Sequence, residues 1–282
     1  MKMKGTLYLC ATPIGNLGDV SARCLEVFQK ADVIAAEDTR RTIQLLNHFE
    51  IAKPLTSYHE HNKAEKGAYL ISLLEEGKQV VLVSDAGTPA ISDPGEDLVR
   101  LCIAHEIPVT SIPGPVAAVN ALILSGLSTR RFSFEGFLSV NKRHRHEHLN
   151  SLKNDTHTLI FYEAPHKLRT TLADLEKVFG GDRKIALARE LTKLHEEILR
   201  MTISEAAAYY QDQNPRGEYV LIVEGADETK KQEEAAPWME WTVAEHVERL
   251  IQEGIPQKDA LKEVAKLRGI PKREVYQAYH IE

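Results

Sequence analysis

The chain has 282 residues, of which 43% are hydrophobic and 27% are charged, a composition that is ordinary for a globular protein. This balance excludes a mainly disordered chain, and no apolar run approaches the roughly 18 residues that a membrane-spanning helix needs. The formal net charge of −6 argues against a protein that coats nucleic acid by bulk charge, although a local basic surface could still guide one polyanion to one site.

Three segments of the first half repeat the same order of strand, Gly/Pro-rich loop and helix. Strands are predicted over 6–11, 79–83 and 107–112, loops over 12–18, 84–95 and 113–115, and helices over 21–30, 96–105 and 116–124. The strand at 79–83 is apolar throughout, which is typical of a strand buried on both faces of a parallel sheet. The repeat predicts an N-terminal α/β domain over 1–115 with a mostly parallel sheet.

Residues 116–225 predict a second α/β domain that is richer in strands. Its strands are expected over 132–138, 157–162, 184–188 and 218–224, and its clearest helix over 167–179. A polar, hairpin-like region separates the last two strands. The basic, His-rich stretch 141–148 is interpreted as a loop.

The remaining residues predict a linker followed by a small helical tail. Residues 226–237 are charged and almost free of large apolar side chains, as linkers are. Three short helices are expected within 238–282, at 241–253, 257–267 and 271–280, and Thr242 and Glu245 have the spacing of a capping box. The tail is helix-turn-helix-like. Because its basic and acidic residues balance, docking or a structural role is favoured over nucleic-acid contact.

The three Gly/Pro-rich loops are candidates for ligand binding. Ligands of open parallel sheets bind beyond the carboxyl ends of the strands, which is where all three loops fall. None of them matches a phosphate-binding motif. The loops therefore predict a cleft whose ligand is not held by phosphates, the alternative being that they are simply well-formed turns.

Charged side chains gather directly after the strand-like residues 33–35. Glu37, Asp38, Arg40 and Arg41 combine two carboxylates and two guanidinium groups, which can orient a polar substrate or a phosphodiester. The alternative is a helix N-cap at Asp38 or Thr39 surrounded by solvated charges.

Two histidine-rich segments are candidates for metal binding. His59 and His61 are two residues apart, as ligands on a strand can be, but no third ligand is near, so no metal is expected. The stretch 141–148 is either a loop that contacts a polyanion through Lys142, Arg143 and Arg145 or a solvated loop. Two more charged stretches, 161–169 and 188–197, follow strands and are either surface or part of the cleft.

Seven segments, taken together and in order, resemble one family. They are 12–19 (TPIGNLGD), 36–40 (AEDTR), 57–62 (SYHEHN), 84–95 (SDAGTPAISDPG), 112–115 (IPGP), 161–166 (FYEAPH) and 188–193 (ARELTK). They are similar to the S-adenosylmethionine-dependent methyltransferases of the tetrapyrrole-methylase-like class, and within it to those that modify small-subunit ribosomal RNA. The resemblance covers essentially the whole chain. One departure is 138–140 (LSV), where a proline is expected after the leucine, and it affects only local loop geometry.

The resemblance implies two α/β domains of the tetrapyrrole methylase type, with S-adenosylmethionine held in the cleft between them, and a homodimer. The implied reaction is 2′-O-methylation of a cytidine ribose in the decoding region of 16S ribosomal RNA, with the assembled 30S subunit as the partner. The implied cofactor-binding residues are Pro13, Ile14, Gly15, Asp85, Ala86, Gly87, Thr88, Pro113, Gly114, Pro115, Tyr162, Glu163 and Ala188.

The segment 36–40 would then face the substrate ribose. A ribose hydroxyl is a poor nucleophile, and a positioned base typically contributes about 10²–10⁴-fold to the rate. We hypothesise that Glu37 or Asp38 is this base and that Arg40 binds an adjacent phosphate, with Lys193 and His195 as further catalytic candidates. The candidate RNA-binding residues are Arg40, Arg41, Lys142, Arg143 and Arg145.

Three other functions are alternatives. The nearest is an enzyme of the same class that acts on a corrin precursor or a protein side chain, but the paired arginines, the basic stretch and the tail favour RNA. A non-catalytic regulator that senses S-adenosylmethionine is the second. A nucleotide hydrolase is the third, and it would need a carboxylate cluster around Mg²⁺ that the sequence lacks. Cys10, Cys24 and Cys102 are scattered and odd in number, and no apolar signal segment is present, so we expect a reduced, cytoplasmic protein.

Overall fold

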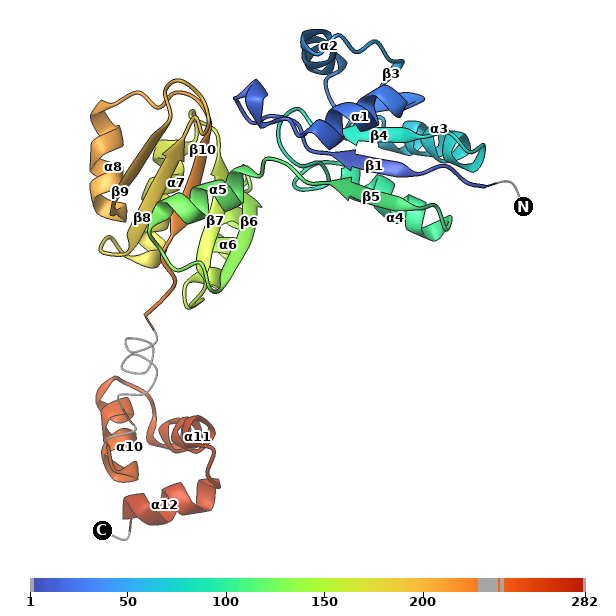
Figure 1. Ribbon diagram of the computed structural model, residues 1–282. Coiled ribbons are helices and arrows are strands. Elements are labelled where there is room, and N and C mark those ends of the chain that lie inside the picture. Colours follow the sequence, from blue (N-terminus) through green and yellow to red (C-terminus); the bar gives the residue numbers. More distant parts are fainter. Residues whose placement is uncertain (1–2, 228–237, 239–240, 281–282) are drawn as a thin grey trace. The chain divides into compact units, whose positions relative to one another are not determined.

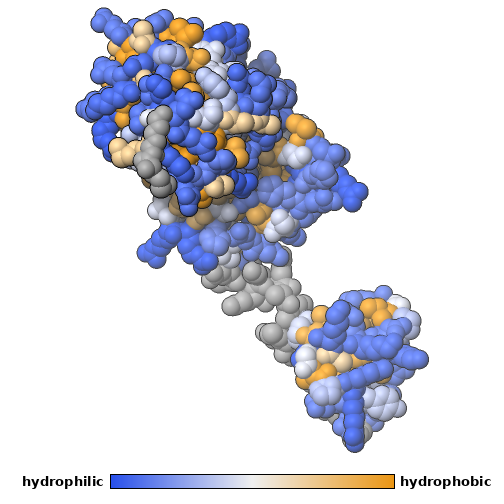
Figure 2. Space-filling view, turned by 90° about the vertical axis from the view of Figure 1, so that its right-hand side faces the viewer, coloured by the Kyte–Doolittle hydropathy of each residue, from blue (hydrophilic) through white to orange (hydrophobic). Residues whose placement is uncertain are grey.

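The computed structural model describes residues 3–227, 238 and 241–280. The chain divides into two compact units, 1–225 and 226–282, each of which is described by itself (Figure 1). On the face drawn in Figure 2, hydrophilic residues predominate and hydrophobic residues gather in small patches. Within the described ranges, no helix is both long and apolar enough to cross a membrane.

The first sheet of unit 1–225 is parallel throughout. Its strands are β1 (Leu7–Cys10), β2 (Val33–Ala36), β3 (Leu55–Ser57), β4 (Val80–Val83) and β5 (Val109–Ile112), in the order β3-β2-β4-β1-β5. The four apolar residues of β4 are all buried at the centre of the sheet. Because all five strands run the same way, their carboxyl ends meet at one edge.

Helices cover both faces of this sheet. They are α1 (Ala22–Lys30), α2 (Thr39–His48), α3 (Lys63–Glu75) and α4 (Gly95–Ala104), with a 3₁₀ turn, η1, at Leu17–Asp19. Val80 and Leu82 pack with residues of α3 and α4 on one face, while Val81 and Val83 pack with residues of α1 and α2 on the other. The alternation along β4 therefore builds a three-layer α/β sandwich.

The second sheet of the same unit is mixed. Its strands are β6 (Phe132–Phe137), β7 (Thr158–Glu163), β8 (Lys184–Arg189), β9 (Glu197–Thr202) and β10 (Tyr219–Val223), in the order β6-β7-β10-β8-β9. Strand β10 lies antiparallel to both β7 and β8, and β6 and β7 are parallel. Helix α5 (Ala117–Ser125) packs on one face, and α6 (Lys142–Leu152), α7 (Leu168–Phe179) and α8 (Ile203–Asp212) pack on the other.

Unit 226–282 has its own small core. Its described helices are α10 (Val243–Gln252), α11 (Gln257–Arg268) and α12 (Lys272–His280). They bury Val247, Leu261, Val264 and Val275 against one another. Thr242 and Glu245 form the predicted capping box at the start of α10, with both reciprocal hydrogen bonds present.

The predicted α/β class and most predicted elements are confirmed. The exception is 141–148, where the loop interpretation is wrong because Asn141 caps the basic helix α6 with its side-chain oxygen. Strand β3 and helices α3 and α8 were not predicted. The predicted linker at 226–237 lies, beyond residue 227, outside the described residues, and the predicted domain boundary at 115/116 stays a prediction.

Candidate active site

The segment after β2 separates two carboxylates that the sequence could not tell apart. Asp38 is the N-cap of α2, and its Oδ1 accepts a hydrogen bond from the Arg40 backbone N–H at 2.9 Å. The Arg40 guanidinium donates to both carboxylate oxygens of Asp38, at 3.0 and 2.7 Å. These contacts with Arg40 lower the pKa of Asp38 to about 2. Of the two residues considered as the N-cap of this helix, Asp38 is the one that caps it.

Glu37 has the opposite electrostatic environment. Its pKa is raised above the ordinary value, first by partial removal from water and then by the carboxylates of Asp85 and Asp93. His59 and Arg41 act in the opposite direction but do not cancel the rise. Glu37 therefore binds a proton more readily than Asp38 does, which is the property a general base needs.

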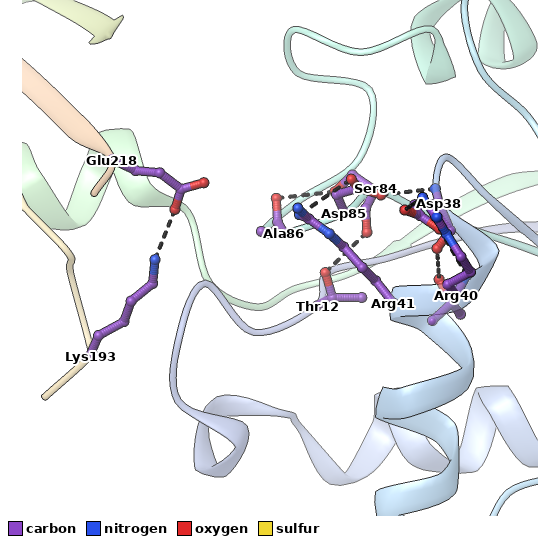
Figure 3. A network of polar contacts seen from close by, with 10 residues as sticks. Thr12, Asp38, Arg40, Arg41, Ser84, Asp85, Ala86, Lys193 and Glu218 are labelled. Atoms are coloured by element: carbon purple, nitrogen blue, oxygen red, sulfur yellow. Dashed lines mark hydrogen bonds and ion pairs between the residues drawn. The ribbon is translucent and has the colours of Figure 1, made fainter. Parts of the chain in front are cut away.

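Hydrogen bonds join the loops that follow β1, β2 and β4 (Figure 3). Thr12 and Gly87 exchange backbone hydrogen bonds at 2.9 and 3.1 Å. Asp85 accepts the Asp38 backbone N–H through Oδ1 at 2.9 Å and pairs with Arg41 through Oδ2 at 3.4 Å. The three loops thus form one connected surface at the carboxyl edge of the first sheet.

The loop after β5 joins this surface through a side chain. The Thr88 hydroxyl donates to the Pro115 carbonyl at 3.1 Å. Gly114 has no room for a side chain, because a Cβ there would lie 2.7 Å from the Ala11 Cβ. Pro113–Pro115 therefore pack directly behind the loop that follows β1.

The second sheet contributes an aromatic group and a charged network. Tyr162, at the end of β7, accepts the Ala118 backbone N–H of α5 at 3.2 Å through its hydroxyl oxygen. Lys193 donates to Glu190 and Glu218, each at 3.0 Å, and Figure 3 shows the contact with Glu218. Glu190 has a positive φ of 50°, a conformation that a non-glycine residue adopts only when its surroundings hold it there.

A cavity of about 390 Å³ lies where these groups meet within unit 1–225. The predicted site residues that line it are Ile14, Glu37, Arg41, Asp85, Ala86, Gly87, Thr88, Tyr162, Ala188 and Lys193. Further lining residues include Asp93, Val116, Phe137, Glu190, Leu191, Glu218 and Val220. Five carboxylates and two basic side chains therefore face a space that is otherwise largely apolar.

Several predicted residues lie beside this cavity rather than in its wall. Pro13 and Gly15 line a second cavity of about 310 Å³ that shares Arg41, Ser84 and Asp85 with the first. Glu163 is buried, and its carboxylate accepts the Thr171 hydroxyl at 2.5 Å and the Ala164 backbone N–H at 2.8 Å. Its carboxylate is therefore occupied by contacts among the residues that pack on the second sheet.

The candidate RNA-binding residues differ in how far their side chains are exposed to solvent. Arg40, Lys142 and Arg143 are exposed. Arg145 is only 9% exposed, donates to Asp174 of α7 at 2.7 Å and also donates to the Ser139 and Val140 carbonyls. Its guanidinium is therefore occupied inside the protein, against the expectation that it contacts RNA.

Some residues that line the cavity were not predicted from the sequence, for two different reasons. Asp93 belongs to the segment 84–95, and its loop has positive φ angles at Ala90 and Ser92 that the residue pattern does not predict. Glu218 and Val220 lie at the beginning of β10, and their position depends on the antiparallel direction of that strand. Across the described ranges, no three His, Cys, Asp or Glu side chains are grouped as a metal ion would require.

Comparison with known proteins gives consistent matches. The family model for tetrapyrrole (corrin/porphyrin) methylases matches residues 6–207. The chain is 51% identical to the ribosomal RNA small subunit methyltransferase I of Halalkalibacterium halodurans, covering 99% of this chain and 96% of the relative. It is 47% identical to the protein of that name from Bacillus subtilis, covering 99% and 95%.

Solved structures share the fold of unit 1–225. The methyltransferase CobJ superposes with a TM-score of 0.60 at 19% identity, covering 79% of this chain and 95% of that one. Uroporphyrin-III C-methyltransferase from Thermus thermophilus, complexed with S-adenosyl homocysteine, gives a TM-score of 0.57 at 14% identity, covering 77% and 97%. At these identities the likeness shows the fold alone.

Proposed function

We propose a function for this chain from the family to which it belongs, the ribosomal RNA small subunit methyltransferase I family of the tetrapyrrole methylases. The chain transfers a methyl group from S-adenosylmethionine to the 2′-oxygen of a cytidine ribose in the decoding region of 16S ribosomal RNA. The observation that carries the proposal is one cavity that is lined by Glu37 from the side of the first sheet and, from the second, by Tyr162, Ala188 and Val220 beside the Lys193 charge network.

The residues of this cavity fit S-adenosylmethionine. The cofactor has no phosphate and a positively charged sulfur, and the cavity has no phosphate loop and more carboxylates than basic groups. Its volume is within the usual range of small-molecule sites. At Gly87, whose φ is +83°, a Cβ would lie 3.3 Å from Ile14 and 3.5 Å from the Pro115 carbonyl, so bare backbone forms this part of the wall.

The cofactor would be held chiefly by backbone and apolar groups. Ile14 and residues 85–88 offer the loop backbone of the first sheet, and Tyr162 and Ala188 offer the opposite wall. Pro13, Gly15 and Pro113–Pro115 support these loops from behind. When bound, the cofactor supplies an electrophilic methyl carbon, whose bond to sulfur breaks as the ribose oxygen bonds to it.

Glu37 is the group that we assign to the ribose hydroxyl. Its raised pKa suits it to take up the hydroxyl proton as the oxygen attacks. Asp38 is assigned a structural role instead, because its low pKa and its pairing with Arg40 leave it a weak base. Arg41 and Asp85, which pair at 3.4 Å, hold the edge of the cavity beside Glu37. Lys193 remains a secondary candidate for contact with the substrate.

Exposed basic side chains would bring the RNA to the cavity. Arg40, whose side chain is 86% exposed, lies in the first turn of α2, three residues after Glu37, and is assigned to a phosphate. Lys142 and Arg143 begin α6 and are exposed. Because the chain as a whole is acidic, such local basic groups must provide the attraction. We propose that the substrate is the assembled 30S subunit in the cytoplasm.

We also propose that the chain acts as a homodimer. Helix α5 presents large apolar side chains to solvent, with Val119 and Ile123 exposed by 46% and 64%. Neighbouring exposed apolar groups of this kind mark contact surfaces. The expected result is a dimer in analytical ultracentrifugation that an Ile123→Glu substitution converts to a monomer.

The test of the activity is transfer of a labelled methyl group to small subunits from a strain that lacks the gene. Mass spectrometry of the ribosomal RNA should then locate one new 2′-O-methylcytidine, which is absent without enzyme. Transfer to a corrin precursor or to a protein side chain instead would support the other enzymes of this class. Cofactor binding without transfer to any acceptor would support a regulator.

A further inference from the structure

An exposed aromatic ring lies where the cavity opens to solvent. Phe137, the last residue of β6, lines the cavity, yet it is 57% exposed. Ile91, from the loop after β4, also lines the cavity and is 40% exposed. Large apolar side chains that are exposed together mark a contact surface. Neither residue has a role in the function proposed above.

A β-bulge turns the Phe137 ring toward the cavity. Phe134 pairs with Ile160 of β7, and after a shift of register at Gly136, Phe137 pairs with Tyr162. In a regular strand, residues three apart point to opposite faces, whereas Ile160 and Tyr162 are two apart and share a face. The extra residue therefore places Phe134 and Phe137 on one face, where their ring centroids lie 5.0 and 5.5 Å from that of Tyr162. Bulges beside active sites often re-aim a side chain in this way.

The bulge also contacts the loop of the first sheet that borders Glu37. Gly136 has a φ of +63°, and a Cβ there would lie 3.2 Å from the Ser92 Oγ, in the loop after β4. Asp85, in the same loop, accepts the backbone N–H of the residue after Glu37 at 2.9 Å. One loop therefore touches both the bulge beside Phe137 and the segment of Glu37, and both of these side chains line one cavity.

The turn after Phe137 connects the ring to the basic start of α6. Arg145, which is buried, donates to both carbonyls of residues 139–140, at 3.1 and 3.3 Å, and so fixes this turn. Lys142 and Arg143 begin α6 and are exposed. An exposed ring followed by exposed cations suits a polyanion, whereas the cofactor carries a positive charge and no phosphate.

We propose that the Phe137 ring stacks on the base of the nucleotide whose ribose is methylated, while Lys142 and Arg143 contact the flanking phosphates. Proteins that bind single-stranded RNA combine aromatic rings, on which unstacked bases lie, with basic groups along the backbone. Because every base has a π-face, the stack holds the nucleotide without reading its identity. This inference rests on the proposed function, since it states how the RNA is held beside Glu37.

The first experiment measures single-turnover methyl transfer at rising concentrations of 30S subunits from a strain that lacks the gene. Phe137→Ala should lower the ratio of maximal rate to half-saturating concentration by about 5- to 150-fold, the range of a base–aromatic stack. Phe137→Tyr keeps an aromatic face and should stay near the wild type. Phe137→Leu keeps only an apolar group and should resemble Phe137→Ala. Phe132→Ala, at the other end of β6 and 46% exposed, is the control.

Titration calorimetry with S-adenosylmethionine separates the RNA from the cofactor. Phe137→Ala should bind the cofactor with wild-type affinity. A loss of cofactor affinity as large as the loss in the rate ratio would assign the ring to the cofactor and overturn the proposal, and so would a Phe137→Leu variant as active as the wild type. Circular dichroism of each variant establishes that it folds. If Phe137→Ala does not fold, the contrast between Phe137→Tyr and Phe137→Leu decides.

A second experiment does not depend on methyl transfer. Phe137→p-benzoyl-phenylalanine in the full chain is irradiated with unmethylated 30S subunits, and reverse transcription locates the crosslink in the RNA. The crosslink should fall on the methylated nucleotide or its immediate neighbours, and Phe132→p-benzoyl-phenylalanine should give none there. A Phe137 crosslink elsewhere, none at all, or the same one from Phe132 would overturn the proposal. If this crosslink forms but no nucleotide is methylated, the proposed function fails while the contact of Phe137 with RNA stands.

Discussion

The two sheets of unit 1–225 meet the cavity with different edges. The first sheet is parallel, so it presents carboxyl ends alone, and the loops and the helix α2 that follow these ends carry Glu37, Asp85 and Arg41. The second sheet is mixed, so it presents the ends of β7 and β8 together with the beginning of β10. These contribute Tyr162, Ala188 and Val220.

Because of this difference, the two sheets contribute different kinds of residues to the cavity. Loops at the carboxyl ends of parallel strands can be long and charged because they leave the sheet, whereas residues still within an antiparallel ladder are held by their neighbours on both sides. Under the proposed function, the side of the first sheet supplies Glu37 and Arg40, whereas the strands of the second sheet supply most of the opposite wall and its helix α6 supplies Lys142 and Arg143. Substitutions on the two sides should differ in kind.

The largest expected effect is that of Glu37→Gln, compared with Glu218→Gln from the opposite wall. Loss of the base should lower single-turnover methyl transfer by about 10²–10⁴-fold. Glu218 is 75% exposed and pairs with Lys193, and an exposed pair is worth at most about 1 kcal/mol, or about fivefold. Rates are measured with saturating cofactor on 30S subunits.

The same two variants can also show that the roles assigned to the two sheets are wrong. Isothermal titration calorimetry should give the same cofactor affinity for Glu37→Gln as for the wild type, which separates chemistry from binding. A larger loss from Glu218→Gln than from Glu37→Gln would mean that the second sheet, not the first, carries the chemistry.

The next effect concerns two glycines that both have a positive φ. Gly87, in the cavity, has a φ of +83°, and Gly180, at the end of α7, has a φ of +88°. A non-glycine residue held in a sparsely populated backbone conformation costs about 1–3 kcal/mol, so both alanine substitutions should lower the melting temperature. Only Gly87→Ala should weaken cofactor binding, by about tenfold, because its methyl group would press on Ile14 and Pro115.

Calorimetric titration of both variants decides this prediction. Gly180→Ala is the control, since nothing lies within 4 Å of its added Cβ. Equal cofactor affinities in the two variants would contradict the assignment of the 85–88 backbone to the cofactor.

A smaller effect on the reaction is expected from Tyr162→Phe in the second sheet. The substitution keeps the ring contacts with Phe134 and Phe137 but leaves the Ala118 N–H without its acceptor. An unsatisfied buried donor costs about 1–3 kcal/mol, which should appear as lower stability in calorimetry with little change in rate. Tyr209→Phe, on an exposed ring, is the control. A loss of rate comparable to that of Glu37→Gln would show that Tyr162 takes part in the chemistry.

The sequence predicts the cavity residues of the first sheet better than those of the second for the same reason. Strand β4 is an unbroken apolar run, and the Gly/Pro loops follow their strands directly, so the charged residues of the first sheet could be placed at its carboxyl edge from the sequence. Glu218 and Val220 could not, because only the pairing of β10 with β7 and β8 shows that its beginning faces the cavity.

Long-range partners explain the other failures. Arg145 lies in a segment that reads as solvated, yet it is buried because Asp174, on another helix, neutralises it. Asp38 and Glu37 are adjacent carboxylates in the sequence, and only the pairing of Asp38 with Arg40 and the partial burial of Glu37 near Asp85 and Asp93 give them opposite pKa shifts. Residue types could be read from the sequence, but not the protonation equilibria that decide which one reacts.

The smallest expected effect is on the stability of unit 226–282, outside both sheets. It tests whether the melting of this unit can be told apart from the melting of the sheets. His246 of α10 is 2% exposed, stacks on Trp238, and accepts a hydrogen bond from Arg268 Nε through Nδ1 at 3.2 Å. Burial, and then the charge of Arg268, lower its pKa below the ordinary value of 6.5. The folded helical unit therefore takes up this proton only at a lower pH than the unfolded chain does.

The sign of the pH dependence follows from that difference. Below pH 6.5 the unfolded chain binds more protons than the folded unit, so the stability of the helical unit is fully present above pH 6.5 and falls as the pH is lowered through this window. The two tryptophans of the chain, Trp238 and Trp241, are both in this unit, so their fluorescence reports its unfolding and not that of the sheets.

His246→Phe should remove the pH dependence of this stability, while His280→Gln, on the exposed end of α12, should keep it. A tryptophan melting temperature that does not change with pH in the wild type would mean that His246 is protonated equally in both states. If the melting temperature seen by tryptophan fluorescence depends on pH, the unfolding of the helical unit can be recognised in calorimetry. The remaining differences in melting temperature among the sheet variants then arise in unit 1–225.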